Sequence, residues 1–275
     1  MKKIALLFTV AVLATGFNAA AQTTNAVPDE LHALVGQIQA KITSGKTTEA
    51  DLAGELQQFD VILAEEKGAK TEDAAQIVYM KAMLYVEVLN DPDKGVALIK
   101  TLKADYADTK YGKHADDMLA AIDKQAASKK IQAGLDSGLD FPDFAEKDLN
   151  GNAISVGGLK GKVVLVDFWA TWCGPCRAEL PNVIATYKKH HGEGFEIIGV
   201  SLDSDRDKLD AFLKKQDGMT WPQYFDGQGW SNKLATKYGV EAIPFAVLVG
   251  KDGKIIGKEL RGEALEAAVA TALAK

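Results

Sequence analysis

Residues 163–176 read VVLVDFWATWCGPC. The first six are apolar apart from Asp167 and rich in β-branched side chains, which is typical of a strand buried on both faces of a sheet. Two cysteines follow, Cys173 and Cys176, where this strand leads into a segment with helical spacing. This part of the chain therefore predicts a buried strand, a loop and a helix, with both cysteines at the junction.

Similar segments alternate along the rest of the chain. Further strands are predicted at 195–202 and 245–249, and helices at 176–190, 205–216 and 231–238. A hairpin around Asn150 and Gly151 is expected before the first core strand, and a strand at 255–256 and a helix at 263–274 follow the last one. This alternation predicts an α/β domain over residues 141–275, in which helices cover the sheet.

The first half of the chain has a different pattern. Between residues 27 and 131, apolar side chains recur at the spacing of one helix face, as at Leu31 and Leu34. We expect five helices with short connections, which make a small all-α helical domain. The segment 77–89 is apolar on two faces and is predicted to be its central helix. Residues 132–140 are largely polar and contain glycine, and we interpret them as a linker.

Composition supports a folded protein of two domains. The chain has 275 residues, of which 47% are apolar and 25% charged, close to globular averages, so a disordered or fibrous protein is excluded. The formal net charge is −6 and the pI is near 5.4. We therefore expect no nucleic-acid partner, because binding phosphates favours a basic surface.

The amino terminus has the features of an export signal. Lys2 and Lys3 precede an apolar run, and three alanines end at Ala21. Residues 1–21 are therefore predicted to be a signal peptide, cleaved after Ala21, and the protein is expected in the bacterial periplasm or cell envelope. An uncleaved membrane anchor is the alternative, since the apolar stretch up to Phe17 could form a short span.

The chain contains only two cysteines, three residues apart, so an intrachain disulfide must join Cys173 to Cys176. Such a small loop gains little stability from a disulfide. A structural zinc site needs four ligands, and the chain has no second cysteine pair to supply them. Covalent haem attachment needs a histidine directly after the second cysteine, and this chain has Arg177 there. The four histidines, including His190 and His191, lack metal-ligand spacing and are expected to be solvated. A redox role is therefore the better interpretation of the pair.

The position of each cysteine indicates its role. Cys173 is expected to lie at the positive end of a helix, which lowers the pKa of its thiol and makes it the nucleophile. Cys176 lies one turn further on, is expected to be shielded from solvent and is predicted to resolve the mixed disulfide. Asp167 beneath the pair and Glu179, three residues after Cys176, are candidates for proton transfer. The alternative is that Asp167 is a satisfied buried polar group and that Glu179 only complements the helix dipole.

These residues resemble the active site of thioredoxin, and more closely that of the exported TlpA/ResA-like thiol-disulfide oxidoreductases. Pro181 falls where such proteins kink the active-site helix, and Ile243 with Pro244 matches their cis-proline element. The resemblance covers about residues 139–275. It implies a thioredoxin fold that catalyses thiol–disulfide exchange on protein substrates, with no cofactor beyond the dithiol. The helical half lies outside the resemblance to thioredoxin.

The resemblance also implies roles for the residues around the cysteines. Gly174 and Pro175 are the intervening pair of reducing thioredoxin, which favours a reductase, and similar proteins draw electrons from a DsbD-type membrane donor. Ile243 with Pro244 is expected to align the substrate backbone, although an edge-strand proline is the alternative for Pro244. Trp172, next to the nucleophile, is expected to shape the substrate surface.

Two other functions fit the sequence. One is a thiol-dependent peroxide reductase, although the usual threonine-bearing approach to a peroxidatic cysteine is absent. The other is a redox-switched binding protein that docks a protein partner through its helical domain. The identity of the substrate is left open.

Overall fold

The computed structural model describes residues 29–66 and 68–275. Contacts divide the chain into two compact units, Met1–Lys124 and Gln125–Lys275. The predicted signal peptide, residues 1–21, lies outside the described residues, as does residue 27, where the helical domain is predicted to begin. Among the described helices, none combines the length and the apolar character needed to cross a bilayer.

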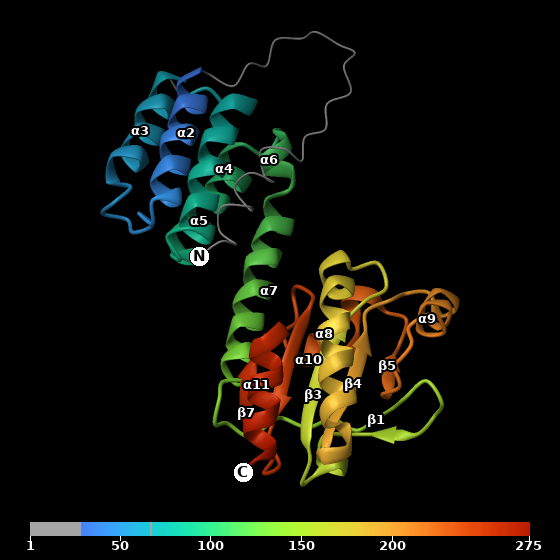
Figure 1. The fold of residues 1–275 in the computed structure, drawn as a ribbon. Helices are drawn as coiled ribbons and strands as arrows, with labels where there is room; N and C mark the ends of the chain where they lie inside the picture. Colours follow the sequence, from blue (N-terminus) through green and yellow to red (C-terminus); the bar gives the residue numbers. More distant parts are fainter. Residues whose placement is uncertain (1–28, 67) are drawn as a thin grey trace. The chain divides into compact units, whose positions relative to one another are not determined.

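The described part of the first unit is helical, as predicted (Figure 1). Its helices are α2 (Asp29–Thr43), α3 (Ala53–Glu65), α4 (Glu72–Glu87), α5 (Pro92–Asp105), the short α6 (Lys110–Lys113) and α7 (Ala115–Ala133). The sequence did not predict α6, because a single turn is too short to show a periodic apolar face. Helix α7 continues beyond Lys124 and through the first two residues of the predicted linker.

Helix α4 is the central helix, as its two apolar faces predict. On one side, Ile77 and Leu84 belong to a core with side chains of α2 and α3. On the other side, Val78 and Ala82 belong to a second core with side chains of α5. A helix that is apolar on both faces must be covered on both, and the short connections place its neighbours there.

The second unit is built on a five-stranded sheet in the order β5-β4-β3-β6-β7. Its strands are β3 (Val163–Trp169), β4 (Phe195–Ser201), β5 (Gln223–Phe225), β6 (Phe245–Val249) and β7 (Ile255–Lys258). Strands β3, β4 and β5 are parallel, and β6 and β7 run antiparallel to their neighbours. The sequence missed only β5, a three-residue strand that follows Pro222 directly and is too short to show a pattern.

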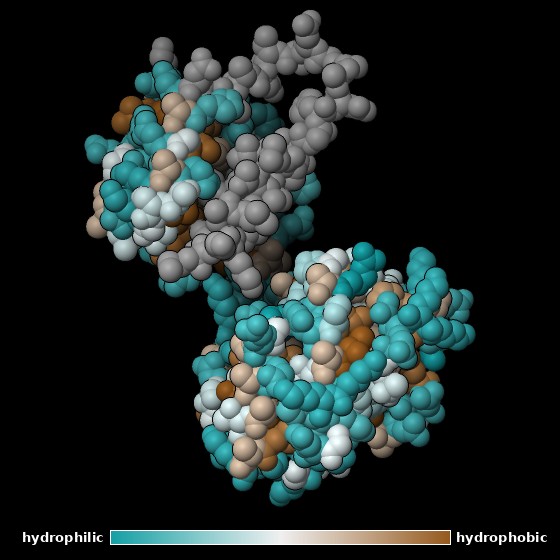
Figure 2. Space-filling model, in the orientation of Figure 1, coloured by the Kyte–Doolittle hydropathy of each residue, from teal (hydrophilic) through white to brown (hydrophobic). Residues whose placement is uncertain are grey.

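Besides the end of α7, four α-helices and a hairpin accompany this sheet. The helices are α8 (Gly174–His190), α9 (Arg206–Leu213), α10 (Lys233–Lys237) and α11 (Gly262–Leu273), and the hairpin joins β1 (Glu146–Lys147) to β2 (Ala153–Ile154). Strand β3 is buried along almost its whole length between β4 and β6, which explains its unbroken apolar run. On the face drawn in Figure 2, hydrophilic residues predominate over the described surface of each unit, because the apolar side chains gather in separate cores.

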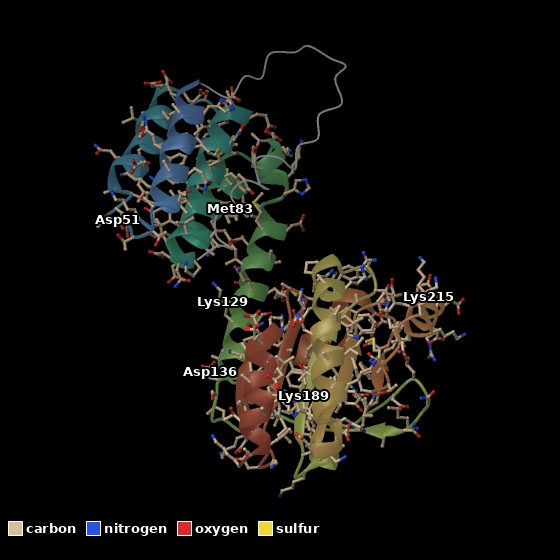
Figure 3. All side chains as sticks on the ribbon, in the orientation of Figure 1. Asp51, Met83, Lys129, Asp136, Lys189 and Lys215 are labelled. Carbon is tan, nitrogen blue, oxygen red and sulfur yellow. A yellow bond between two sulfur atoms is a disulfide. The ribbon has the colours of Figure 1, made fainter. Side chains whose placement is uncertain are left out.

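The prediction that His190 is solvated was wrong. The ring is buried near the end of α8, and its two nitrogens contact Glu193 (2.8 Å) and Glu266 (3.0 Å). The hydrogen bonds with Glu193 and then Glu266 raise the pKa of His190 above its usual value. Neighbouring Lys189, labelled in Figure 3, also pairs with Glu266 at 2.7 Å. Glu266 lies on α11, so this contact of the histidine depends on the packing of α8 against α11.

One prediction concerns a close backbone approach in the helical unit. A Cβ placed on Gly112 would lie 2.0 Å from the carbonyl oxygen of Tyr106, whereas one on Gly36 in α2 would meet nothing within 4 Å. We expect Gly112→Ala to lower the free energy of unfolding by about 1–3 kcal/mol through overpacking. Gly36→Ala, the matched control, should raise it by up to about 1 kcal/mol through helix propensity. Urea denaturation followed by circular dichroism measures both, and equal midpoints for the two variants would contradict this account.

Candidate functional site

The two cysteines lie where β3 gives way to α8 and form a disulfide with an S–S distance of 2.06 Å. Cys173 is the N-cap residue of α8, and its Sγ accepts a hydrogen bond from the backbone N–H of Cys176 at 3.2 Å. The first amide groups of a helix have no partners within the helix, so this sulfur occupies a position that favours negative charge.

Burial does not distinguish the two cysteines in the disulfide form. The exposed fraction is 5% for Cys173 and 6% for Cys176, although the sequence suggested that Cys176 would be the shielded one. Gly174 and Pro175, between them, are exposed and form the first turn of α8. What separates the two sulfurs is their place on the helix: one caps its start and the other lies inside the first turn.

Asp167 lies at a small cavity of about 20 Å³ that is also lined by Cys176, Glu179 and Pro244. The site therefore brings together both predicted carboxyl groups, one cysteine and the predicted cis-proline. Asp167 keeps partial exposure, but protein atoms crowd around its carboxyl group. This burial raises the pKa of Asp167 from 3.8 to about 6, against the opposing effect of the Arg261 charge.

Glu179 is held by two hydrogen bonds. One of its carboxylate oxygens accepts from the backbone N–H of Gly262 at 2.7 Å, and the other accepts from Asn182 Nδ2 at 3.2 Å. Gly262 is the first residue of α11, where Arg261 supplies no side-chain cap. Glu179 thus places its negative charge at the start of α11 as well as beside the small cavity.

The peptide bond between Ile243 and Pro244 is cis, as predicted. Ile243 is partly buried and packs against the core of the unit. The carbonyl oxygen of Pro244 accepts a hydrogen bond from Arg261 Nη2 at 2.7 Å. No sequence pattern pointed to Arg261, because this residue follows an irregular segment after β7 and reaches the site only through the fold.

A buried carboxylate that the sequence analysis missed supports the loop before Cys173. Asp203 accepts hydrogen bonds from the backbone N–H of Thr171 at 3.0 Å, from Thr171 Oγ1 at 2.6 Å and from Ser201 Oγ at 2.8 Å. Asp203 follows β4, the parallel neighbour of β3, so both strands deliver their next residues to the same edge of the sheet. The position of Asp203 at the end of a predicted strand was therefore a sequence signal that could have identified this residue.

Two tryptophans form an exposed aromatic surface next to the cysteines. Trp172 is 54% exposed and Trp230 is 47% exposed, and their ring centroids lie 5.9 Å apart. Trp230 lies in a short 3-10 turn, Gly229–Ser231, far from Trp172 in the sequence. No three His, Cys, Asp or Glu side chains within residues 29–66 and 68–275 group closely enough to hold a metal ion.

The raised pKa of Asp167 predicts a pH-dependent stability. Below pH 3.8 the group is protonated whether folded or unfolded, and as pH rises through about 6 the folded protein loses stability because it must hold a buried charge. We expect Asp167→Asn to stabilise the oxidised protein at about pH 8 by roughly 2 kcal/mol, less than the full shift because the carboxyl group is partly exposed. The gain should vanish near pH 4. Urea unfolding at both pH values measures it, and a pH-independent difference would refute the assignment.

Comparisons with known proteins identify the family of the second unit. A family profile described as Redoxin matches residues 136–273. The thiol-disulfide oxidoreductase ResA of Bacillus thuringiensis is 36% identical over 129 residues, which are 47% of this chain and 72% of that protein. Tryparedoxin of Trypanosoma brucei brucei is 34% identical over 115 residues, 41% of this chain and 78% of that one.

A solved structure of a thiol:disulfide interchange protein from Bacteroides sp. is 34% identical in sequence. It covers 52% of this chain and 93% of its own, with a TM-score of 0.45. The family match spans half of the chain, and the ResA match covers more than two thirds of that relative. The chain therefore belongs to the Redoxin family, and its second unit is a thioredoxin-fold thiol–disulfide oxidoreductase similar to ResA.

Proposed function

We propose that this protein is an exported reductase of protein disulfides that works through Cys173 and Cys176. The observation that carries the proposal is the position of the pair. Cys173 caps the start of α8 with its sulfur on a backbone N–H, and Cys176 borders the small cavity that holds Asp167. This arrangement supplies a stabilised thiolate and a nearby proton acceptor, the two things that disulfide exchange requires.

The reaction starts from the reduced dithiol. The Cys173 thiolate attacks one sulfur of the substrate disulfide, which breaks the substrate S–S bond and releases its other sulfur as a thiolate that takes up a proton. Cys176 then loses its proton and attacks Cys173 Sγ. This step closes the Cys173–Cys176 disulfide and releases the second substrate thiol, so two electrons pass from the protein to the substrate.

Asp167 is the proposed acceptor of the Cys176 proton. With a pKa of about 6, it is ionised near neutral pH yet remains basic enough to take up a proton during the reaction. The small cavity, which both residues line, has about 20 Å³ of room, enough for one water molecule. Glu179 is proposed to assist by raising the proton affinity of Asp167 through its own negative charge, while its hydrogen bond to Gly262 keeps it in place.

The remaining site residues are proposed to bind the substrate. Ile243 and Pro244 align its backbone next to the cysteines, and Trp172 gives an exposed apolar contact beside the nucleophile. Gly174 and Pro175 favour the reducing direction, which requires re-reduction by a DsbD-type membrane donor. Export through the signal peptide and docking of a protein partner by the helical unit complete the proposal.

Trapping of the intermediate tests the exchange mechanism. We expect reduced Cys176→Ser protein to form a stable mixed disulfide through Cys173 with insulin, because the resolving thiol is absent. Non-reducing electrophoresis and mass spectrometry of the adduct measure it. Cys173→Ser, the matched control, should form none. A folded Cys176→Ser protein without any adduct would reject the mechanism. If the protein consumes peroxide instead, the peroxide reductase is favoured. If it captures a partner without turnover, the redox-switched binding protein is favoured.

The role of Asp167 has a separate kinetic test. We expect Asp167→Asn to slow insulin reduction at about pH 8 on the order of a hundredfold, because the Cys176 proton loses its acceptor. In the unsubstituted protein the rate should fall as pH decreases through about 6, where Asp167 becomes protonated, and the variant should lack this transition. Stopped-flow measurement of the reduced proteins across this range gives both results. An unchanged pH profile in the variant would assign the proton transfer to another group.

A further inference from the structure

Two neighbouring residues reach the site from the junction between β7 and α11. Arg261 Nη2 donates to the carbonyl oxygen of Pro244 at 2.7 Å, and its Nη1 donates to the carbonyl oxygen of Leu260 at 3.0 Å. The backbone N–H of Gly262 donates to Glu179 at 2.7 Å. Two consecutive residues thus hold both the cis-proline and a carboxylate of α8.

These hydrogen bonds fix the guanidinium group of Arg261 without neutralising it. A guanidinium is planar and donates in fixed directions, so two hydrogen bonds from different nitrogens determine its orientation. Both acceptors are backbone carbonyl oxygens, which carry no net charge. The positive charge is therefore held in place and stays available to act on other groups nearby.

This charge lies at the small cavity beside the cysteines. The charged and titratable residues that line the cavity are Asp167 on β3, Cys176 and Glu179 on α8, and Arg261 before α11. Arg261 is the only cation among these lining residues. Charges in a partly buried site are screened less by salt than charges on the surface, so their effects on one another are larger. Arg261 therefore influences how readily a carboxyl group of this cavity ionises.

Asp167 is the carboxyl group that responds to this charge. Burial raises the pKa of Asp167 from 3.8 to about 6, the Arg261 charge acts against burial, and the charge of Glu179 raises the pKa further. Without the Arg261 charge, the carboxyl group of Asp167 would stay protonated to a higher pH. It would then be less able to take up a proton near neutral pH.

We propose that Arg261 is a positioning residue of the exchange reaction. Its hydrogen bond holds the cis-proline segment where a substrate backbone docks, and its charge keeps Asp167 ionised so that Asp167 accepts the Cys176 proton. Arg261 acts through these two residues rather than on the reacting sulfur atoms. The inference rests on the proposed function, since it gives Arg261 a task through the roles assigned there to Pro244 and Asp167.

The charge is tested on the oxidised full chain, without any exchange reaction. Carbon-13 NMR of the aspartate carboxyl groups gives the pKa of Asp167, and the signal lost in Asp167→Asn identifies this residue. We expect Arg261→Gln to move the titration of Asp167 upward by about one pH unit, because it removes the positive charge that lines the cavity. Arg261→Lys keeps the charge and should stay near the unsubstituted midpoint. If the titration in Arg261→Gln coincides with that of the unsubstituted protein, the proposal is overturned.

The kinetics of insulin reduction by the reduced proteins test both parts of the proposal. We expect Arg261→Gln to raise KM for insulin about threefold to tenfold, as the loss of one hydrogen bond predicts. The pH at which kcat rises should also move upward by about one pH unit. Arg261→Lys should restore the pH profile but not KM, because an ammonium group lacks the guanidinium fork that reaches both carbonyl oxygens. An unshifted pH profile in a folded Arg261→Gln protein would leave only a structural role and contradict the proposal.

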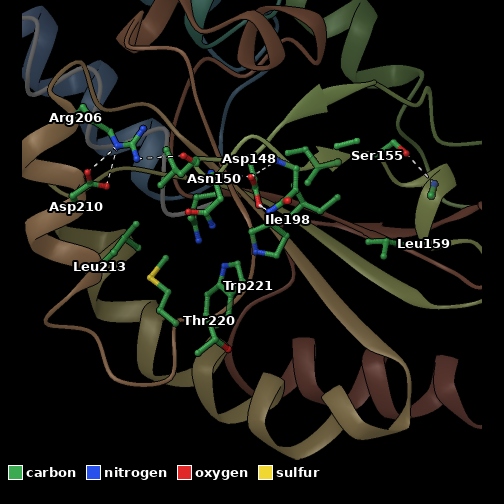
Figure 4. Close-up of a pocket in the computed structure, with 18 of the residues that line it drawn as sticks. Asp148, Asn150, Ser155, Leu159, Ile198, Arg206, Asp210, Leu213, Thr220 and Trp221 are labelled. Atoms are coloured by element: carbon green, nitrogen blue, oxygen red, sulfur yellow. Dashed lines mark hydrogen bonds and ion pairs between the residues drawn. The ribbon is translucent and has the colours of Figure 1, made fainter.

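Arg206→Gln is the matched control, because it removes a positive charge from another part of the same unit. Arg206 lies on α9 and pairs with Asp210 at 2.9 Å (Figure 4). The pocket that these two residues line shares no lining residue with the small cavity. We therefore expect an unchanged KM and pH profile. A change as large as that in Arg261→Gln would show a general effect of charge and reject the specific role of Arg261.

Failure of this inference can be told apart from failure of the proposed function. If the unsubstituted protein reduces insulin with no transition near pH 6, Asp167 is not the proton acceptor, and the role of Arg261 fails with it. If that transition is present but does not move in Arg261→Gln, only the inference about Arg261 fails. Should Arg261→Gln not fold, Arg261→Lys decides, since an unchanged KM in that variant overturns the hydrogen-bond role.

Discussion

The junction between β3 and α8 is the constraint on which the active site depends. Strand β3 is held between β4 and β6 and buried on both faces, so hydrophobic packing fixes the point at which the chain leaves the sheet. Helix α8 begins there, and its first amide groups need acceptors. The sulfur of Cys173 is one of these acceptors, because it accepts a hydrogen bond from the backbone N–H of Cys176. Burial of an apolar strand thus sets the electrostatic environment of a thiol.

Burial and charge oppose each other at Asp167. The surrounding protein disfavours the ionised carboxylate, Arg261 favours it, and Glu179 disfavours it further. Arg261 and Glu179 are in turn tied to the ends of other elements, through the carbonyl of Pro244 and the N–H of Gly262. The proton affinity of the buried acid therefore depends on how β6 and α11 are packed around α8. A structural role and an electrostatic role coincide in the same hydrogen bonds.

Strand β5 supplies a polar side chain to the core beside the small cavity. The side-chain oxygen of Gln223 accepts a hydrogen bond from the indole of Trp169, which lines the small cavity. Gly199, opposite on β4, leaves the room that this side chain occupies, since a Cβ there would lie 2.1 Å from Gln223 Oε1. This polar side chain is tolerated in the core because its amide oxygen is hydrogen-bonded.

The sequence by itself determined the core strands, the two-sided helix α4, the cysteine pair and the carboxyl groups beside it, because periodicity and spacing are local properties of the chain. Only the tertiary structure decided which other groups reach the site. Arg261 and Asp203 meet partners far away in the sequence, His190 is covered by α11, and Trp230 joins Trp172 from a separate turn. Such contacts depend on how elements pack, and no local pattern of residues records that arrangement.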